Sequence, residues 1–248
     1  MTGVQTCALP ISLRQIAGQK LVDTDGEETI LELLPPATHA EVAALEASLP
    51  APLPDEIRAA LAVTTGLANG PLESFSLLDL EGFGLDEVFP HAYSIAHDGF
   101  GNYWVLDLLP DATDWGPVFF ACHDPAVIAF QAPSVESFLR DLVAAPPDAP
   151  GSPINRVHDT VVHQLWKDHS GLITQPVAAS SSDPAIREFA SSLVPEALIA
   201  DLRNAEIGSG FAWGQYGPRT DIKRFGTQRL WAITAPPKST GFFARLFG

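Results

Sequence analysis

The order of the sequence patterns predicts an α+β fold, in which helices flank an antiparallel sheet and an α+β C-terminal extension follows. Two helix patterns come first, within residues 38–65. Short apolar strands then follow one another between residues 93 and 130, which is typical of an antiparallel meander. A further helix pattern begins after Ser134. Helices on both sides of a run of strands favour a sheet that carries helices on its faces.

The first helix is predicted over residues 38–48, because Thr38 and Glu41 have the spacing of a capping box. Its apolar stripe is Val42, Leu45 and Leu49. A second helix is expected to begin near Pro54, with acidic residues in its first turn. Gly66 is expected to be its C-cap and to open a loop that runs to Pro71.

The strand region begins with a predicted hairpin of residues 93–96 and 103–108, joined by the turn residues 98–102. Two further strands are expected over residues 118–122 and 127–130, with a His-Asp-Pro turn between them. Ser134 is the predicted N-cap of the helix that closes this region. The buried stripe of that helix is Val135, Phe138, Leu139 and Leu142.

Residues 144–153 are rich in proline, alanine and glycine and are the predicted linker. Beyond it we expect a helix with Ser152 as N-cap and Pro153 in its first turn, ending at Gly171. A second helix is expected from Asp183 to about Leu193, and a hairpin from residues 220–224 and 228–233. The predicted division of the chain is residues 1–11, 12–30, 31–145 and 151–248.

The charge of the 248-residue chain is strongly acidic and unevenly distributed. The formal net charge is −16, yet residues 1–150 hold 22 acidic and four basic side chains, whereas residues 151–248 hold eight and ten. Hydrophobic residues make up 46%, which excludes a fully disordered acidic chain. Apolar runs are too short for a membrane span of about 20 residues. Phosphate would repel such a chain, so direct binding to nucleic acid is not expected.

Residues 1–11 carry a different signal. The string from Thr2 to Ile11 resembles the translation of a sequencing-library adapter, so we expect this segment to be an artefact and exclude it from the fold prediction. Of the two cysteines, Cys7 lies in this segment. The remaining thiol, Cys122, cannot form an internal disulfide, which indicates a reducing compartment and a cytoplasmic location.

The order of motifs over residues 31–143 resembles the SUKH superfamily, the Smi/Knr-type domain. The resemblance rests on two Leu-Pro pairs (34–35 and 53–54), the Asp-Gly-x-Gly-Asn turn (98–102) and the Tyr-x-Val-Leu-Asp strand (103–107). A closing Ser-x-x-x-Phe-Leu helix begins at Ser134. Residues 201–218 resemble an extension found on some longer bacterial members, to which no activity is attached.

The resemblance implies an immunity protein that neutralises a cognate toxin, often a nuclease, by direct binding. An acidic surface fits that role, because it can mimic the phosphate that a basic nuclease site binds. Our candidate partner-binding residues are Asp79, Glu81, Asp86, Glu87, Asp98, Asp111 and Asp114. The alternative is an intracellular scaffold or regulator of the same fold that binds a housekeeping partner. Oligomeric state is not predicted.

Enzymatic chemistry has weak support in the sequence. His97-Asp98 and His123-Asp124 could form acid–base pairs or metal ligands, and a hydrolase that uses His97 and His123 is the third hypothesis. Both pairs fall in predicted turns, where these residue types are common for backbone reasons. The histidines 158, 163 and 169 lack the i, i+4 spacing of a helical zinc site. We therefore expect no catalytic residues, no metal and no cofactor.

Overall fold

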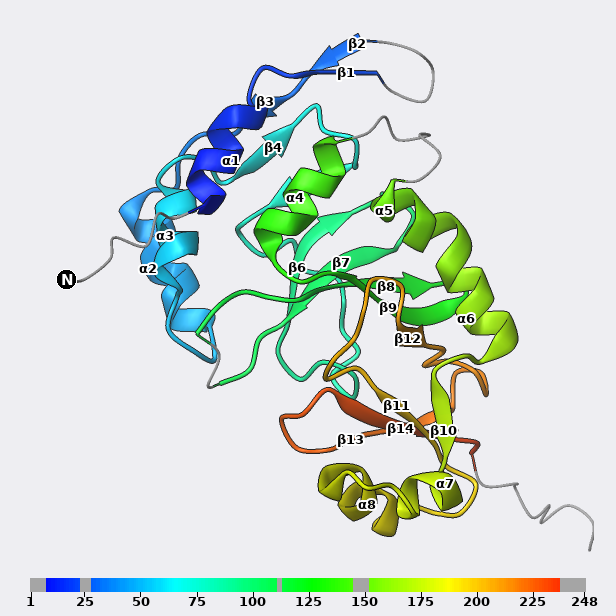
Figure 1. Ribbon diagram of the computed structural model, residues 1–248. Coiled ribbons are helices and arrows are strands. Elements are labelled where there is room, and N and C mark those ends of the chain that lie inside the picture. The colour runs from blue at the N-terminus through cyan, green and yellow to red at the C-terminus, as the bar shows by residue number, and fades with distance from the viewer. Residues whose placement is uncertain (1–7, 23–27, 111–112, 145–151, 237–248) are drawn as a thin grey trace, which may run out of the picture.

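A computed structural model describes residues 8–22, 28–110, 113–144 and 152–236. Its centre is an eight-stranded antiparallel sheet with the order β12-β9-β8-β7-β6-β5-β4-β3 (Figure 1). The strands are β3 (Glu32–Leu33), β4 (Gly66–Ala68), β5 (Ser74–Ser76), β6 (Ala92–His97), β7 (Tyr103–Asp107), β8 (Val118–His123), β9 (Ala126–Ala132) and β12 (Gly210–Phe211). The predicted α+β class, the 93–108 hairpin and the two strands after it are confirmed.

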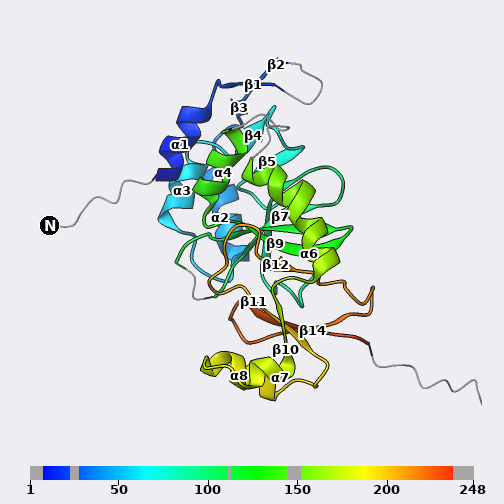
Figure 2. The same ribbon diagram turned by 45° about the vertical axis from the view of Figure 1, so that its right-hand side comes forward.

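Four helices accompany this sheet. They are α1 (Ala8–Ile16), α2 (His39–Ser48), α3 (Asp55–Leu61) and α4 (Val135–Val143). α1, α2 and α3 gather beside the β3–β4 end of the sheet, while α4 lies across one face (Figures 1 and 2). The capping box of α2 is confirmed, because the Thr38 hydroxyl accepts from Glu41 N and the Glu41 carboxylate accepts from Thr38 N. Ser134 caps α4 as predicted.

The prediction for Gly66 is wrong. The helix ends at Leu61, and Gly66 begins strand β4, so the segment before Pro71 contains a strand as well as a loop. Gly66 pairs with Ser76, and a Cβ on Gly66 would collide with the carbonyl oxygen of Phe75. The glycine is therefore required by the close approach of two strands and not by a helix end.

The first residues form a small unit at the N-terminal end. After α1, strands β1 (Lys20–Val22) and β2 (Glu28–Ile30) form a two-stranded antiparallel sheet. Residues 8–11, within the segment that resembles an adapter, are the first turn of α1, and Leu9 and Leu13 are buried. The assignment of residues 1–11 to an adapter stays a prediction.

A continuous helical rod follows residue 152 and packs beside α4. It consists of α5 (Pro153–Asn155), the π-helical turn η1 (Arg156–Val161) and α6 (Val162–Asp168). The predicted helix is confirmed in extent, but the Ser152 side chain makes no capping hydrogen bond, contrary to the prediction. At the other end, His169 takes the left-handed conformation with φ 49° two residues before Gly171.

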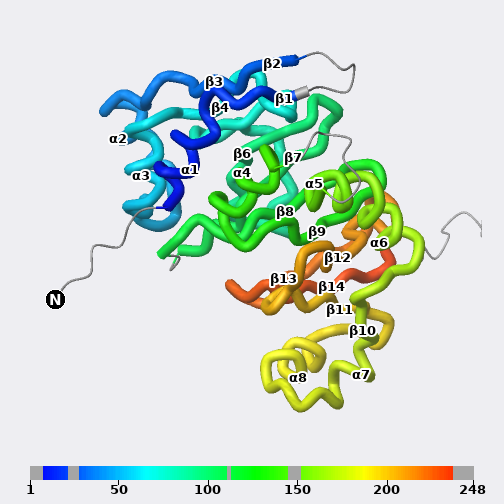
Figure 3. Tube along the Cα trace, turned by 45° about the horizontal axis from the view of Figure 1, so that its top comes forward, coloured from blue at the N-terminus to red at the C-terminus, as the bar shows by residue number. Residues whose placement is uncertain are grey.

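A second, four-stranded antiparallel sheet has the order β10-β11-β14-β13. Its strands are β10 (Leu172–Thr174), β11 (Leu198–Asp201), β13 (Asp221–Arg224) and β14 (Leu230–Thr234). Helices α7 (Gln175–Ala179) and α8 (Pro184–Ser191) lie on the face of this sheet that points away from the large sheet (Figures 1 and 3). The predicted 220–233 hairpin is confirmed as β13 and β14, and Asp183 caps α8.

The large sheet has a hydrophobic core on each face. Alternate residues of β7 enter opposite cores: Trp104 packs with Phe138 of α4, while Val105 belongs to the core shared with Trp231 of the second sheet. β12 also pairs with β9, so residues from both sides of 145–151 share the large sheet. Most of the predicted 144–153 linker lies outside the described residues. None of the helices in the described ranges has the length and apolar character that a membrane crossing requires.

Candidate partner-binding surface

Four of the predicted partner-binding residues lie on one loop, residues 78–91, which we call the acidic loop. It joins β5 to β6, and Asp79, Glu81, Asp86 and Glu87 are all exposed on it. The carboxylate of Asp79 accepts hydrogen bonds from Glu81 N (3.2 Å) and Ser94 N (3.0 Å), so it also shapes the loop. The side chains of Asp86 and Glu87 make no hydrogen bond to any residue that the structure describes, and both are exposed.

A second loop, residues 108–117, lies beside the acidic loop. Ala92 pairs with Asp107 at the end of the β6–β7 ladder, and Leu108 N donates to His91 O (3.2 Å). The Tyr93 and Trp115 rings also meet, with centroids 4.6 Å apart. This loop carries the exposed Asp114, so five predicted carboxylates lie on loops at the same end of strands β5, β6 and β7, which we call the acidic edge. Asp111 lies outside the described residues.

A cavity of about 730 Å³ opens beside Asp114 and Trp115. It is also lined by the first turns of three helices, which contribute Asp55 and Glu56 from α3 and Glu136 from α4. Glu56 accepts from Leu9 N (3.0 Å), and Glu136 accepts from the Ser12 hydroxyl (3.3 Å). Because a helix N-terminus stabilises anions, these carboxylates have a structural reason to be there. Asp55 and Asp114 are the exposed carboxylates of this lining.

Asp98 is not part of this edge. It lies in the β6–β7 turn at the opposite end of the hairpin, and its side chain is only 9% exposed. Its carboxylate accepts from Phe100 N (2.8 Å), Asn102 N (3.2 Å) and the Asn102 amide (2.6 Å), and meets His158 Nε2 at 3.2 Å. Asp98 therefore holds the turn together, and little of its side chain is accessible to a partner.

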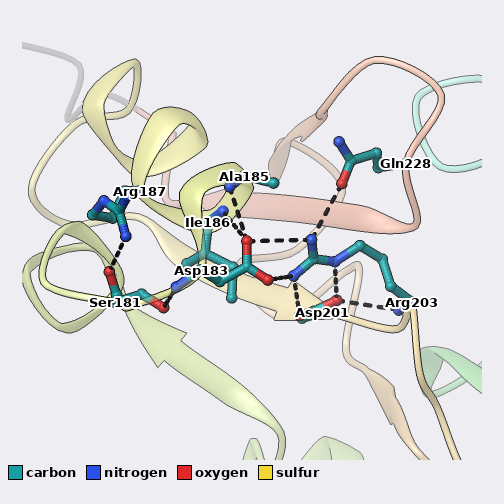
Figure 4. Close-up of polar contacts among 8 residues, drawn as sticks. All are labelled: Ser181, Asp183, Ala185, Ile186, Arg187, Asp201, Arg203 and Gln228. Atoms are coloured by element: carbon teal, nitrogen blue, oxygen red, sulfur yellow. Dashed lines mark hydrogen bonds and ion pairs between the residues drawn. The ribbon is translucent and has the colours of Figure 1, made fainter.

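Asp183 and Asp201, at the second sheet, are engaged internally. Arg203 lies between Asp183 and Asp201, with Nη2 at 2.8 and 2.7 Å from their oxygens, and Gln228 accepts from the same guanidinium (Figure 4). Hydrogen bonds from Arg203 hold the pKa of Asp183 and of Asp201 below the ordinary value. This network joins the N-terminus of α8 to β11, and its acids are not free for a partner.

Comparison with known proteins places the acidic loop and the loop after β7 in one family segment. Residues 36–141 match the model of the SMI1 / KNR4 family (SUKH-1). These residues form a SUKH-type domain. The match confirms the resemblance drawn from the motifs and leaves residues 152–236 outside the matched segment. Searches of the curated proteins and of the solved structures gave no significant match.

The two histidines of the hydrolase hypothesis do not meet within the SUKH-type domain. His97 pairs with Tyr103, and Tyr103 pairs with Ala121, so β7 separates His97 on β6 from His123 on β8. Strands lie about 4.8 Å apart, so β6 and β8 lie about 10 Å from each other across β7. His97 Nδ1 accepts from Gly99 N (3.2 Å), and His123 Nδ1 meets the Asn102 amide oxygen (3.0 Å). Both rings have structural partners at turns.

The cysteine thiol and the potential metal ligands give no sign of a reactive site among the described residues. Cys122 is buried, and burial raises the pKa of its thiol to about 11, so it is protonated at neutral pH. The described residues contain no group of three or more His, Cys, Asp or Glu side chains that could hold a metal ion.

The sequence prediction missed Asp55, Glu56 and Glu136, which line the cavity beside Asp114. All three fall in first turns of helices, where acidic residues are common, so nothing in their local sequence distinguishes them. It also missed the role of Asp107. This residue ends β7 and is 1% exposed, paired with Arg224 at 2.7 Å. That pairing spans 117 residues, which no local pattern can reveal.

Proposed function

We propose that this chain is a non-catalytic protein-binding protein of the SUKH type, an immunity protein that neutralises a cognate toxin by direct binding. The observation that carries the proposal is the exposed acidic edge formed by the acidic loop and Asp114. The partner is expected to be basic, with the lysines and arginines that bind phosphate in a nuclease. Opposite charge on two partners accelerates their association and orients them.

Asp86, Glu87 and Asp114 are the residues that we expect to matter most. All three are exposed, so their carboxylates are accessible to a partner. Exposed charges act mainly on the association rate, so binding should weaken as salt screens the interaction over about 8–10 Å.

Co-expression with the toxins encoded beside the chain tests the proposal. The unmodified chain should restore growth, and the triple variant Asp86→Asn/Glu87→Gln/Asp114→Asn should lose protection, with association slowed about tenfold or more. The matched control Asp124→Asn/Glu188→Gln/Glu196→Gln removes the same charge from exposed positions elsewhere and should protect. Equal protection by both triple variants would contradict the assignment of the acidic edge.

A pull-down from the native cytoplasm separates immunity from the alternative function. Capture of a toxin supports the immunity role. Capture of a housekeeping protein, with no neighbouring toxin neutralised, would support an intracellular scaffold or regulator of the same fold instead. In either case the acidic triple variant should release the captured protein.

A further inference from the structure

We propose that the β13–β14 hairpin braces the acidic loop and so positions Asp86 and Glu87 for the partner. The proposal rests on the proposed function for the purpose of the loop. It gives residues outside the family match a role in the binding surface, although none of them needs to touch the partner.

The brace acts on the two residues that follow Glu87. Val88 and Phe89 are both 0% exposed. The carbonyl oxygen of Val88 accepts from Trp231 Nε1 (2.7 Å) and from Arg224 Nη1 (3.2 Å). The Phe89 ring packs edge-on against Trp231, with centroids 5.7 Å apart and planes at 88°. Two donors on one buried carbonyl fix the backbone next to Glu87, because a lost partner would leave a buried polar group unsatisfied.

Arg224 is itself held rigidly. Its two terminal nitrogens each lie 2.7 Å from an oxygen of Asp107, and the side chains are 5% and 1% exposed. The guanidinium also lies over the Trp231 ring, 5.1 Å from the centroid. A planar guanidinium suits this bidentate arrangement. Two hydrogen bonds to Asp107 and the contact with the Trp231 ring thus fix the guanidinium that donates to Val88 O.

The charge of Arg224 is paired within the fold. Arg224 is bound by Asp107, which also receives Arg229 Nε at 3.3 Å. Arg224 therefore reaches the loop as a hydrogen-bond donor to the Val88 carbonyl, while Asp86 and Glu87 stay exposed.

The two ends of the loop depend on different parts of the chain. At the first end, Leu80 N donates to Ser94 O (3.1 Å) and Asp79 accepts from Ser94 N, both within the SUKH-type domain. At the second end, Val88 N donates to Leu85 O within the loop, but both donors to the Val88 carbonyl come from the β13–β14 hairpin, 136 and 143 residues away. Weakening the hairpin contacts should therefore loosen the second end and leave the first in place.

Native-state proteolysis with a protease that cleaves after glutamate tests the brace. Cleavage of the Glu87–Val88 bond requires Val88 to leave its buried position, so Trp231→Phe, which removes one donor and keeps an aromatic ring, should speed this cleavage about fivefold to tenfold. Amide exchange of Val88 and Phe89 should accelerate equally, whereas exchange at Leu80 should not. Arg224→Lys, which keeps a charge beside Asp107 and removes the guanidinium fork, is the second variant in case the first fails to fold.

Arg203→Ala is the matched control. It removes an arginine from another carboxylate network of the same sheet (Figure 4), one that has no bond to the acidic loop. Cleavage after Glu87 should keep the rate of the unmodified chain in this variant. If both hairpin variants leave cleavage and exchange of the loop unchanged, or if Arg203→Ala loosens the loop as much as they do, the brace is refuted.

The co-expression assay tests the purpose of the brace. Trp231→Phe should lose protection in proportion to the loosening of the loop, while Arg203→Ala should protect. A loosened loop with full protection would overturn the positioning role. Proteolysis and exchange are measured without a partner, so a negative result there refutes the brace but not the partner-binding role of the acidic edge. Conversely, if the acidic triple variant neutralises the toxin as well as the unmodified chain does, the hairpin could still hold the loop, but the loop would not be the binding site.

Discussion

Asp98 occupies the start of the β6–β7 turn, where both carboxylate oxygens have partners. Burial alone would raise its pKa, but the hydrogen bonds from the Asn102 amide, Phe100 N, His158 and Asn102 N together bring the pKa below the ordinary value. The charged form is therefore the form that the fold stabilises. Its contribution to stability is fully present above the pKa of the unfolded aspartate, about 3.9, and is lost as the pH falls through the lower folded pKa.

Asp98→Asn should destabilise the protein at neutral pH by about 1–3 kcal/mol, since an amide NH₂ would face donors that now point at an oxygen. The difference from the unmodified chain should shrink as the pH falls below about 4, because protonation removes the same charge there. Urea unfolding across a pH series measures both effects. Asp124→Asn, at an exposed position in the next turn, is the control and should shift the curve little. A constant difference at all pH values would contradict this account.

Cys122 should be inert in the folded protein. Its thiol is buried and its raised pKa, about 11, keeps it protonated at neutral pH. In a Cys7→Ser background, where Cys122 is the remaining thiol, we expect no reaction with a thiol reagent such as DTNB until the chain unfolds. Titration of one equivalent per chain in denaturant, and far less without it, is the expected result. Rapid reaction under native conditions would show that β8 opens locally.

At the scale of elements, the helical rod 153–168 is connected to the β6–β7 turn through His158. The π-helical turn η1 places the imidazole near Trp104 and Phe120, with ring centroids 6.4 and 5.3 Å away. Its nitrogens meet Asp98 Oδ2 at 3.2 Å and Asp159 Oδ1 at 2.6 Å. π-Helical turns are rare and occur mostly as single turns within α-helices. Here the turn joins a residue outside the family match to the Asp-Gly-x-Gly-Asn motif.

His158→Ala should therefore loosen the hairpin tip more than the helix. We expect a loss of about 1–2 kcal/mol in the free energy of unfolding from the missing contacts to Asp98 and the aromatic rings. Amide exchange at Phe100 and Asn102 should accelerate. His163→Ala, on an exposed position of α6, is the control and should change neither quantity. Faster exchange along α6 with an unchanged tip would contradict the assignment.

Elements with strong local signals could be predicted from the sequence. The Thr38–Glu41 capping box, the Ser134 cap and the Asp183-Pro184 start each satisfy backbone groups within three residues, so the sequence contains all their partners. The short strands β3, β4, β5 and β12 could not be predicted, because two or three residues have no recognisable period. Their pairing depends on distant strands, as Gly66 shows by approaching Phe75.

The candidate surface was predictable only in part, for the same reason. Sequence reasoning named the acids of the loop 78–91 and Asp114, because excess charge is visible without a structure. It could not separate Asp98 from them, since a turn aspartate that accepts backbone hydrogen bonds has the same sequence appearance as an exposed one. Nor could it assign Asp107 to Arg224, a pairing made by the fold.

At the scale of the whole molecule, the two unequal halves of the charge distribution meet in a buried contact. Arg224 and Arg229 belong to the basic C-terminal part, and both pair with Asp107 of the acidic part. Around them, Val105, Phe119 and Phe130 of the large sheet form one core with Trp231 and Ile233 of the second sheet. Because the two sheets share this core, the second sheet packs against the large sheet as part of one folded unit.

A chain that ends at residue 144 should accordingly not form a well-packed protein. It would expose the apolar face that Val105, Phe119 and Phe130 now bury, together with an unpaired Asp107. We expect binding of the dye ANS and a broad thermal transition, in contrast to the full chain. A cooperative transition with no ANS binding would show that residues 31–145 fold alone, as the sequence-based division predicts.

The two-residue strand β12 has a consequence for solubility. It pairs through Gly210 and Phe211 with β9, a seven-residue strand of almost wholly apolar composition, Ala126–Ala132. A Cβ on Gly210 would collide with Ile128 O, so only glycine fits there. Without β12, β9 would be an open edge of unpaired N–H and C=O groups, which is the geometry that lets sheets of separate molecules join into aggregates. These two residues pair with part of the β9 edge, and this pairing should oppose such self-association.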